Sequence, residues 1–494
     1  MNRARIFIAI FLFVGFGFVV SASAQVTAVR TLPGEMYLPG ERITITIEVT
    51  GDPGAIIVLE TPPADWSIRA LGGGQLSEGV ITWNLESFDG STTLKYYATP
   101  PSTATGEALF SGVVGDQEIG GMSRVTAYEV PADVRLPHTT GPYEIGTFLV
   151  HLIDESREEK LTRDDPKDKR ELMVQVWYPA DIQNNRQPGL IYPGFDAVQP
   201  AFEAYFDVPN VFCDGIRVLT GNAVWDAPLL STGRQYPILI FSHGHTSWRH
   251  GNVYLLEELA SHGYVVASID HTYDAAAVQF PDGRIISTLV GSWRSYISLH
   301  VQDVRFVLDQ LEVIGAGPVF ESLADVLNFD RVGVLGMSLG GAVTTQTLQE
   351  DPRFKAGVVL DEEFVTIRAG IDQSAMFLYG SLSPGGTSDL ESALRGGGYT
   401  GRIRGTVHID FSEGPFWWRL FSLPGNWPSS TVDDPVRVTR IIADYTVAFF
   451  DKILKGRSVP LLDGPSADYP EVEFTVYGDP QGLSGILDEE WALY

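Results

Sequence analysis

A serine flanked by two glycines is the clearest chemical pattern in the sequence. Residues 336–340 read Gly-Met-Ser-Leu-Gly, after an apolar run at residues 331–335 and before a helical pattern at residues 340–349. A sharp strand-to-helix turn exposes the serine hydroxyl but imposes strained backbone angles, and glycines on both sides let strand and helix approach each other. This spacing predicts that Ser338 is a nucleophile that attacks a carbonyl carbon.

The base that this serine needs is expected further along the chain. In strand-turn-helix sites of this type, an acid and then a histidine follow the serine. His408 is the only one of the nine histidines that follows Ser338, and it comes directly after an apolar run at residues 402–407. A loop at the end of a strand can direct a side chain at the serine, so we predict that His408 is the general base.

An acidic residue must orient the imidazole and stabilise its charged form. Asp361 directly follows the strand-like run at residues 356–360, and we predict that it is this acid. Glu362 and Glu363 adjoin it and are alternatives, and Asp389 is the nearest carboxylate after the next run.

Two backbone N–H groups must stabilise the oxyanion that forms during attack on an ester. We expect one from Leu339, the residue after the serine, and the other from His245 in the Ser-His-Gly-His loop at residues 242–245. His243 and His245 lie one residue apart, but no carboxylate accompanies them in this loop. The sequence therefore favours neither a metal ion nor a cofactor.

Two regions with different sequence patterns must position these residues. Residues 26–131 alternate apolar and polar positions in short runs separated by Gly and Pro, which is typical of a small antiparallel β-sandwich of immunoglobulin-like type. Trp66 and Trp83 are expected in its core. The strand-like runs are 43–49, 55–59, 80–85, 93–98 and 108–113.

From residue 137 to residue 494, apolar runs alternate with helical patterns, which predicts a mostly parallel sheet covered by helices. A charged segment, residues 154–170, is expected to form an exposed loop or hairpin tip. Cys213 is the only cysteine, which excludes an intrachain disulfide. We expect Cys213 to be a small buried apolar residue. The predicted strands are 172–178, 237–242, 264–269, 331–335, 356–360, 375–379 and 402–407, and the predicted helices are 253–261, 296–313, 340–349 and 436–454.

The first 24 residues have the pattern of an export signal. Arg3 and Arg5 precede an apolar stretch at residues 6–20, and small residues at 22–24 suit a signal peptidase. That stretch is shorter than the roughly 20 residues needed to span a bilayer. We therefore predict a signal peptide at residues 1–24 and a protein exported to the periplasm or the medium, without stable insertion in a membrane.

The composition limits the expected partners. The chain of 494 residues carries 34 Lys and Arg against 62 Asp and Glu, a formal net charge of −28 at pH 7. Such a charge repels phosphate backbones, so nucleic acid is excluded as an expected partner. No oligomeric state is predicted.

Together these motifs resemble the plasma-type platelet-activating factor acetylhydrolases and their bacterial esterase relatives. The resemblance covers most of residues 137–455, and its matching segments are 140–146, 177–179, 236–244, 259–267, 336–340, 346–348 and 351–357, with a further match at residues 407–408. It implies an α/β-hydrolase fold with a Ser338, Asp361 and His408 triad that needs no metal ion. The implied substrates are small-molecule or lipid esters with short acyl chains, including short-acyl phospholipids.

Four tryptophans, Trp248, Trp293, Trp417 and Trp418, are candidates to line the acyl or leaving-group pocket. The same triad would also serve a polyester or dienelactone-type hydrolase or a peptidase. A third interpretation is a non-catalytic surface-binding protein with a relict hydrolase fold.

Overall fold

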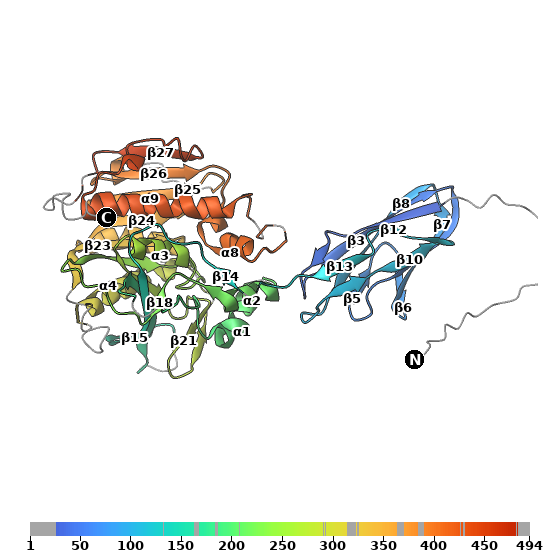
Figure 1. Cartoon of the computed structure of the whole chain (residues 1–494), viewed down its shortest axis with the longest axis horizontal. Helices are drawn as coiled ribbons and strands as arrows, with labels where there is room; N and C mark the ends of the chain where they lie inside the picture. The colour runs from blue at the N-terminus through green and yellow to red at the C-terminus, as the bar shows by residue number, and fades with distance from the viewer. Residues whose placement is uncertain are drawn as a thin grey trace, which may run out of the picture. The chain divides into compact units, whose positions relative to one another are not determined.

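The computed structural model describes residues 26–482, with gaps at 132, 163–166, 183–185, 207, 290, 292, 314–322, 324–325, 363–369, 384–389, 425, 428–429 and 481. The predicted signal peptide at residues 1–24 lies outside the described residues, as do Glu363 and Asp389. The chain divides into two compact units, residues 1–128 and 129–494 (Figure 1).

The regular elements described in the first unit are all strands. They form five-stranded sheets in the orders β12-β1-β3-β8-β5 and β11-β10-β4-β7-β6, and a three-stranded sheet β2-β13-β9. Both larger sheets contribute to one apolar core, which includes Trp66 and Trp83, so the expected place of these tryptophans is confirmed. The strands are β1 (Val26–Thr31), β2 (Met36–Tyr37), β3 (Ile43–Gly51), β4 (Gly54–Thr61), β5 (Ser67–Ala70), β6 (Gln75–Ser77), β7 (Val80–Phe88), β8 (Ser91–Thr99), β9 (Glu107–Leu109), β10 (Ser111–Val114), β11 (Gln117–Glu118), β12 (Gly120–Gly121) and β13 (Arg124–Ala127).

One strand expected in this unit is in fact two. The run at residues 108–113 divides at Phe110 into β9, which pairs with β13, and β10, which pairs with β4. Phe110 is buried at this point, where the chain passes from one sheet to another. The pattern of a single run cannot indicate such a change of partner, because the strands with which it pairs lie elsewhere in the sequence.

The second unit has an α/β-hydrolase fold built on a ten-stranded sheet in the order β18-β15-β16-β20-β19-β23-β24-β25-β26-β27. The six strands from β20 to β26 in this order are parallel to one another. Their carboxyl ends therefore meet at one edge of the sheet, where loops from distant segments come together. The strands of this sheet are β15 (Ile145–Glu158), β16 (Lys169–Pro179), β18 (Val224–Trp225), β19 (Tyr236–Ser242), β20 (Val265–Asp270), β23 (Leu327–Met337), β24 (Phe354–Leu360), β25 (Ser374–Gly380), β26 (Gly398–Ile403) and β27 (Val472–Tyr477).

Helices cover both faces of this sheet. A Cβ atom on Gly333 would meet Phe450 and Leu454 of α9, whereas one on Gly357 would meet Leu348 of α6. Gly357 pairs with Val334, the neighbour of Gly333, and successive strand residues point to opposite faces, so α9 and α6 lie on opposite faces. The helices are α1 (Phe195–Tyr205), α2 (Asn210–Val218), α3 (Val253–Ser261), α4 (Ile297–Val313), α6 (Leu339–Glu350), α7 (Leu390–Ala393), α8 (Gly414–Leu420) and α9 (Pro435–Lys455), with the short 3₁₀ turns η1 (Trp293–Ser295), η2 (His408–Phe411) and η3 (Pro460–Leu462).

The remaining strands form two small pairs, β14 (Val134–Arg135) with β17 (Leu219–Thr220), and β21 (Ala277–Gln279) with β22 (Ile285–Ser287). Cys213 lies buried in α2, as expected, and burial raises the pKa of its thiol. Among the helices of the described residues, none has both the length and the apolar composition that a membrane crossing requires.

The structure corrects two further expectations for this unit. The run at residues 402–407 is not a strand throughout, because β26 ends at Ile403 and a turn with a positive φ at Gly405 precedes His408. The charged segment 154–170 contains the tip of the β15–β16 hairpin, as one of the two alternatives predicted, but it is not exposed throughout, because Arg170 in β16 is fully buried. Arg170 forms an ion pair with Asp303 of α4, and this distant partner makes the burial of its charge possible.

Candidate active site

Ser338 occupies the turn between β23 and α6. Its backbone has φ 55° and ψ −119°, a strained conformation for a residue with a side chain. Hydrogen bonds hold this conformation: the Ser338 N–H donates to the carbonyl of Leu360 at 2.8 Å, and the Gly341 N–H donates to the carbonyl of Ser338 at 2.8 Å. The turn thereby presents the hydroxyl of Ser338 at the carboxyl edge of the sheet.

The glycines around the serine allow this turn. A Cβ atom on Gly336 would lie 2.3 Å from the carbonyl oxygen of Gly340, and a Cβ atom on Gly340 would lie 1.9 Å from the carbonyl oxygen of Ser242. Neither position has room for a side chain, so the steric reason inferred from the sequence applies here.

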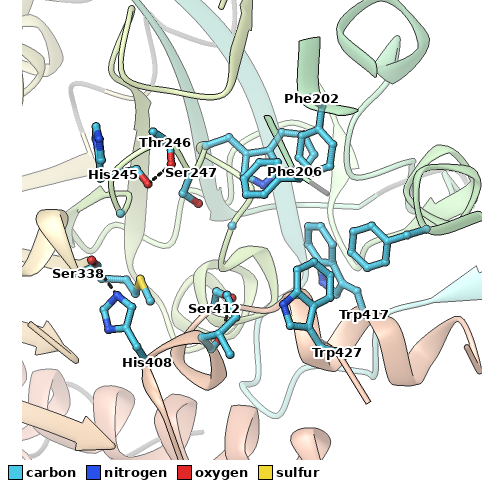
Figure 2. A pocket seen from close by; sticks show the side chains of 17 residues that line it. Phe202, Phe206, His245, Thr246, Ser247, Ser338, His408, Ser412, Trp417 and Trp427 are labelled. Atoms are coloured by element: carbon cyan, nitrogen blue, oxygen red, sulfur yellow. Dashed lines mark hydrogen bonds between the residues drawn. The ribbon is translucent and has the colours of Figure 1, made fainter. Parts of the chain in front are cut away.

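The structure brings Ser338, His408 and Asp361 into one hydrogen-bonded chain. The Nε2 atom of His408 lies 2.9 Å from the Oγ atom of Ser338 (Figure 2), and its Nδ1 atom lies 2.7 Å from Oδ2 of Asp361. Asp361 is fully buried in the turn after β24, whereas the His408 side chain is 43% exposed. A base that is open to the pocket and an acid that is withdrawn from solvent suit proton transfer to and from a bound ester.

Neighbouring groups fix the carboxylate of Asp361. Its Oδ1 atom accepts a hydrogen bond from the N–H of Gly380 at 2.6 Å, and its Oδ2 atom accepts one from the hydroxyl of Ser383 at 2.9 Å. These donors compensate the burial of a negative charge and leave the carboxylate aimed at Nδ1 of His408.

The loop predicted to provide an oxyanion donor lies against the serine. A Cβ atom on Gly244 would lie 3.3 Å from the Cβ atom of Ser338, so the backbone of this loop passes directly beside Ser338. His245 follows Gly244 in the pocket lining, and Leu339 opens α6 on the other side of Ser338. The imidazole of His245 is held by the carboxylate of Asp274, which fixes the loop at this point.

A cavity of about 250 Å³ opens beside Ser338 and His408 (Figure 2). Of the four tryptophans expected there, Trp248 and Trp417 line it. Trp418 is not among the described lining residues; its indole N–H donates to the carbonyl of Pro424, and its ring packs on Phe212. The side chain of Trp293 lies outside the part of the chain that the structure describes.

Four aromatic residues of the lining were missed by the sequence reasoning: Phe202, Phe206, Phe212 and Trp427. Phe202 lies in α1 and Phe212 in α2, two helices that the sequence reasoning did not predict. A signal existed, because Phe195, Val198 and Phe202 recur at the three- and four-residue spacing that places apolar side chains on one helix face.

One buried group has the residue types of a metal site. His271, His300 and Asp303 place one possible ligand atom each within 4.8 Å of the others. The rings of the two histidines are stacked 3.7 Å apart at 8°, so their in-plane lone pairs cannot converge on one ion. Hydrogen bonds occupy both nitrogens of His271, Nδ1 to Asp303 and Nε2 to Ser242, and burial lowers the pKa of His271 to about 4. This geometry suits packing beneath the loop of His243 and Gly244, to which His271 donates a hydrogen bond, better than it suits a metal ion.

Comparison with protein families identifies the relatives of this region. The family model described as platelet-activating factor acetylhydrolase, isoform II, matches residues 128–283 and 298–375. This match includes Ser338 and Asp361 and ends before His408. The platelet-activating factor acetylhydrolase of Cavia porcellus is 28% identical over 282 residues, which cover 48% of this chain and 63% of that enzyme. The chain thus spans less than two thirds of that relative.

Two other relatives extend the comparison. A probable 1-alkyl-2-acetylglycerophosphocholine esterase of Arthroderma benhamiae is 23% identical over 419 residues, 72% of this chain and 97% of that protein. Among solved structures, a ferulic acid esterase of Streptomyces cinnamoneus superposes with a TM-score of 0.58 at 27% identity, covering 69% of this chain and 99% of that chain. The predicted fold and the predicted family resemblance are both confirmed.

Proposed function

We propose, from this relationship to the platelet-activating factor acetylhydrolases, that the protein is an exported serine esterase that hydrolyses short-chain carboxylic esters. The observation that carries the proposal is the hydrogen-bonded chain from Ser338 through His408 to Asp361. The Ser338 end of this chain lies at an apolar cavity. The predicted signal peptide at residues 1–24 supports export.

The reaction would proceed through an acyl-enzyme. Nε2 of His408 accepts the hydroxyl proton of Ser338 while Oγ bonds to the ester carbonyl carbon, and the N–H groups of Leu339 and His245 stabilise the resulting oxyanion. The intermediate collapses with loss of the alcohol, which takes the proton from His408. Water then attacks the acyl-enzyme and loses a proton to His408. The bond between the carbonyl carbon and Oγ breaks, His408 returns this proton to Oγ of Ser338, and the carboxylic acid leaves. Asp361 keeps the Nδ1 proton of His408 in place throughout.

The relatives suggest which esters to examine. Platelet-activating factor acetylhydrolase and 1-alkyl-2-acetylglycerophosphocholine esterase name acetyl esters of a phospholipid, and the ferulic acid esterase names an ester of an aromatic acid. The small cavity favours a short acyl chain in each case, because a long chain would extend beyond the volume of about 250 Å³.

The test is hydrolysis of p-nitrophenyl esters from acetate to dodecanoate by the wild-type protein and by Ser338→Ala. We expect kcat/KM to fall steeply as the acyl chain lengthens, and Ser338→Ala to reduce hydrolysis to the rate of the buffer. If the folded wild-type protein hydrolyses none of the esters, or if Ser338→Ala keeps the activity, the proposal is wrong. A peptidase, a hydrolase of bulky polymers or a surface-binding protein would then be the alternatives.

A further inference from the structure

The wall of the cavity opposite the triad consists of aromatic rings. Figure 2 shows Ser338 and His408 on one side and the rings of Phe206, Trp417 and Trp427 across the cavity from them. The complete aromatic wall is Phe202, Phe206, Phe212, Trp248, Trp417 and Trp427. It draws on α1 with the residue that follows it, on α2, on α8, on the loop that follows β19 and on the segment that follows α8, so five separate segments converge on it.

These rings form a continuous, preformed surface. Ring centroids lie 4.5 Å apart for Phe202 and Phe206, 4.7 Å for Phe202 and Trp248, and 4.9 Å for Phe212 and Trp427. Trp417 joins the two halves, at 6.2 Å from Trp248 and 6.5 Å from Phe212. Its indole N–H donates to the carboxylate of Glu413 at 3.3 Å, which fixes the ring. Such edge-to-face and offset contacts hold the rings in defined orientations.

The charge of the cavity lining limits what it binds. None of the described lining residues is Lys, Arg, Asp or Glu, and His245 and His408 are its titratable side chains. A phosphate group or a carboxylate would therefore find no cationic partner there, and burial of an unpaired charge is costly. An uncharged group is the better occupant.

A quaternary ammonium group is the main alternative, because aromatic cages bind such cations. A cage places ring faces around a central cation. Here Phe202 and Phe206, and likewise Phe212 and Trp427, contact each other, so part of each ring surface is covered by its neighbour. A flat aromatic ring of a ligand can pack against these rings as they pack against each other, and it therefore fits the wall better than a rounded cation does.

The volume agrees with one aromatic ring. An apolar cavity of about 150 Å³ suffices to bind benzene. The cavity of about 250 Å³ thus has room for a single ring together with a short chain that reaches the carbonyl carbon at Ser338. We propose that the preferred substrates are uncharged esters in which the acyl group or the alcohol carries an aromatic ring, and that this ring lies against Trp417 and Trp427. The inference rests on the proposed esterase function.

The test compares esters that differ in aromaticity alone. Benzyl acetate is paired with cyclohexylmethyl acetate, and methyl 3-phenylpropanoate with methyl 3-cyclohexylpropanoate, so that the carbon number is the same and the leaving group nearly so within each pair. We expect kcat/KM for the aromatic member to exceed that for the saturated member by about threefold to tenfold in at least one pair. Acetylcholine is compared with its uncharged analogue 3,3-dimethylbutyl acetate, and we expect no preference for the charged ester.

Variants locate the effect. Trp417→Leu and Trp427→Leu should bring the aromatic-to-saturated ratio close to one, because each removes a ring from the wall. Phe416→Leu is the matched control: Phe416 is also a buried aromatic residue of α8, but its ring packs on Tyr254 of α3. This control should keep the wild-type ratio. A ratio of two rate constants does not respond to a general loss of folded protein.

The outcomes separate the two proposals. Absence of Ser338-dependent hydrolysis of all six esters would overturn the esterase function itself. Ser338-dependent hydrolysis with a ratio of one or less in both pairs would overturn the aromatic preference alone. Faster cleavage of acetylcholine than of its analogue would also overturn it, by showing that the wall binds a cation.

Discussion

Gly340 and Ser242 are in contact across two elements: a Cβ atom on Gly340 would lie 1.9 Å from the carbonyl oxygen of Ser242. The first turn of α6 therefore rests on the last residue of β19. Ser338 stands at the start of α6, and the loop with Gly244 and His245 follows Ser242. This one close contact sets the proposed nucleophile beside the proposed oxyanion donors.

Replacement of Gly340 by alanine should destabilise the second unit by at least about 3 kcal/mol, because backbone on both sides would have to move apart. The midpoint of urea unfolding and kcat/KM measure this effect. Gly34→Ala is the control, since a Cβ atom on Gly34 meets no atom within 4 Å. A Gly340→Ala protein with wild-type stability would show that the turn has more freedom than the structure indicates.

Asp361→Asn should lower kcat/KM by about 10³- to 10⁴-fold with little change in KM, because an amide in place of the carboxylate favours the wrong imidazole tautomer. Steady-state kinetics with p-nitrophenyl acetate measure it. Glu362→Gln, at the neighbouring position that the sequence also suggested, should retain activity. If Glu362→Gln causes the large loss of kcat/KM and Asp361→Asn does not, Asp361 is not the orienting acid.

Asp303→Ala should cost about 3–5 kcal/mol of stability, because it leaves Arg170 buried without its main partner. The two side chains make hydrogen bonds of 2.6 Å and 3.1 Å, and both are fully buried. The free energy of unfolding from urea titration tests this. Asp372→Ala, which breaks an exposed pair with Arg395, should leave stability nearly unchanged. Equal effects of the two substitutions would contradict the structural role of the buried pair.

The contribution of Glu413 to the stability of the second unit should fall as pH rises from about 5 to 8. Burial raises the pKa of Glu413 from 4.5 to about 8, although its carboxylate accepts hydrogen bonds from the N–H groups of Tyr254 and Leu255. In this window the folded chain holds a proton that the unfolded chain has released, so the free energy of unfolding decreases by up to about 1.4 kcal/mol per pH unit.

Urea unfolding at several pH values measures this slope. Glu413→Gln should make this slope more positive than that of the wild type, while Glu257, whose pKa burial raises to about 7, and His271, whose pKa burial lowers to about 4, keep their own contributions. If wild type and Glu413→Gln have the same slope, Glu413 does not titrate in this range.

Local sequence patterns predicted the elements that position the site. The helix at residues 253–261 has the predicted bounds, and those at 340–349 and 436–454 differ from α6 and α9 by one residue at each end. These predictions are correct because the apolar periodicity of the segments and the glycines around Ser338 depend on local geometry. Chain order and the positions directly after apolar runs selected His408 and Asp361, which the structure brings within hydrogen-bond distance of their expected partners. Their catalytic roles stay predictions.

Features that depend on distant partners were not predicted. Arg170 is charged and was expected in an exposed segment, but it is buried against two carboxylates, Glu159 in the same segment and Asp303 in another element. The sequence nearby holds no sign of the pair with Asp303. Phe212 and Trp427 lie far apart in the chain, and their rings meet only in the folded cavity wall. Trp418 is adjacent to Trp417 in the sequence, but its ring lies outside the described lining of the cavity.

The central claim is that Ser338 forms the acyl-enzyme, and reaction with a fluorophosphonate followed by peptide mass spectrometry tests it most directly. We predict one equivalent of label on the peptide that contains Ser338, with no label on the Ser338→Ala protein and much slower labelling of His408→Ala. Label on another residue, or none on a folded protein that hydrolyses p-nitrophenyl acetate, would contradict the account.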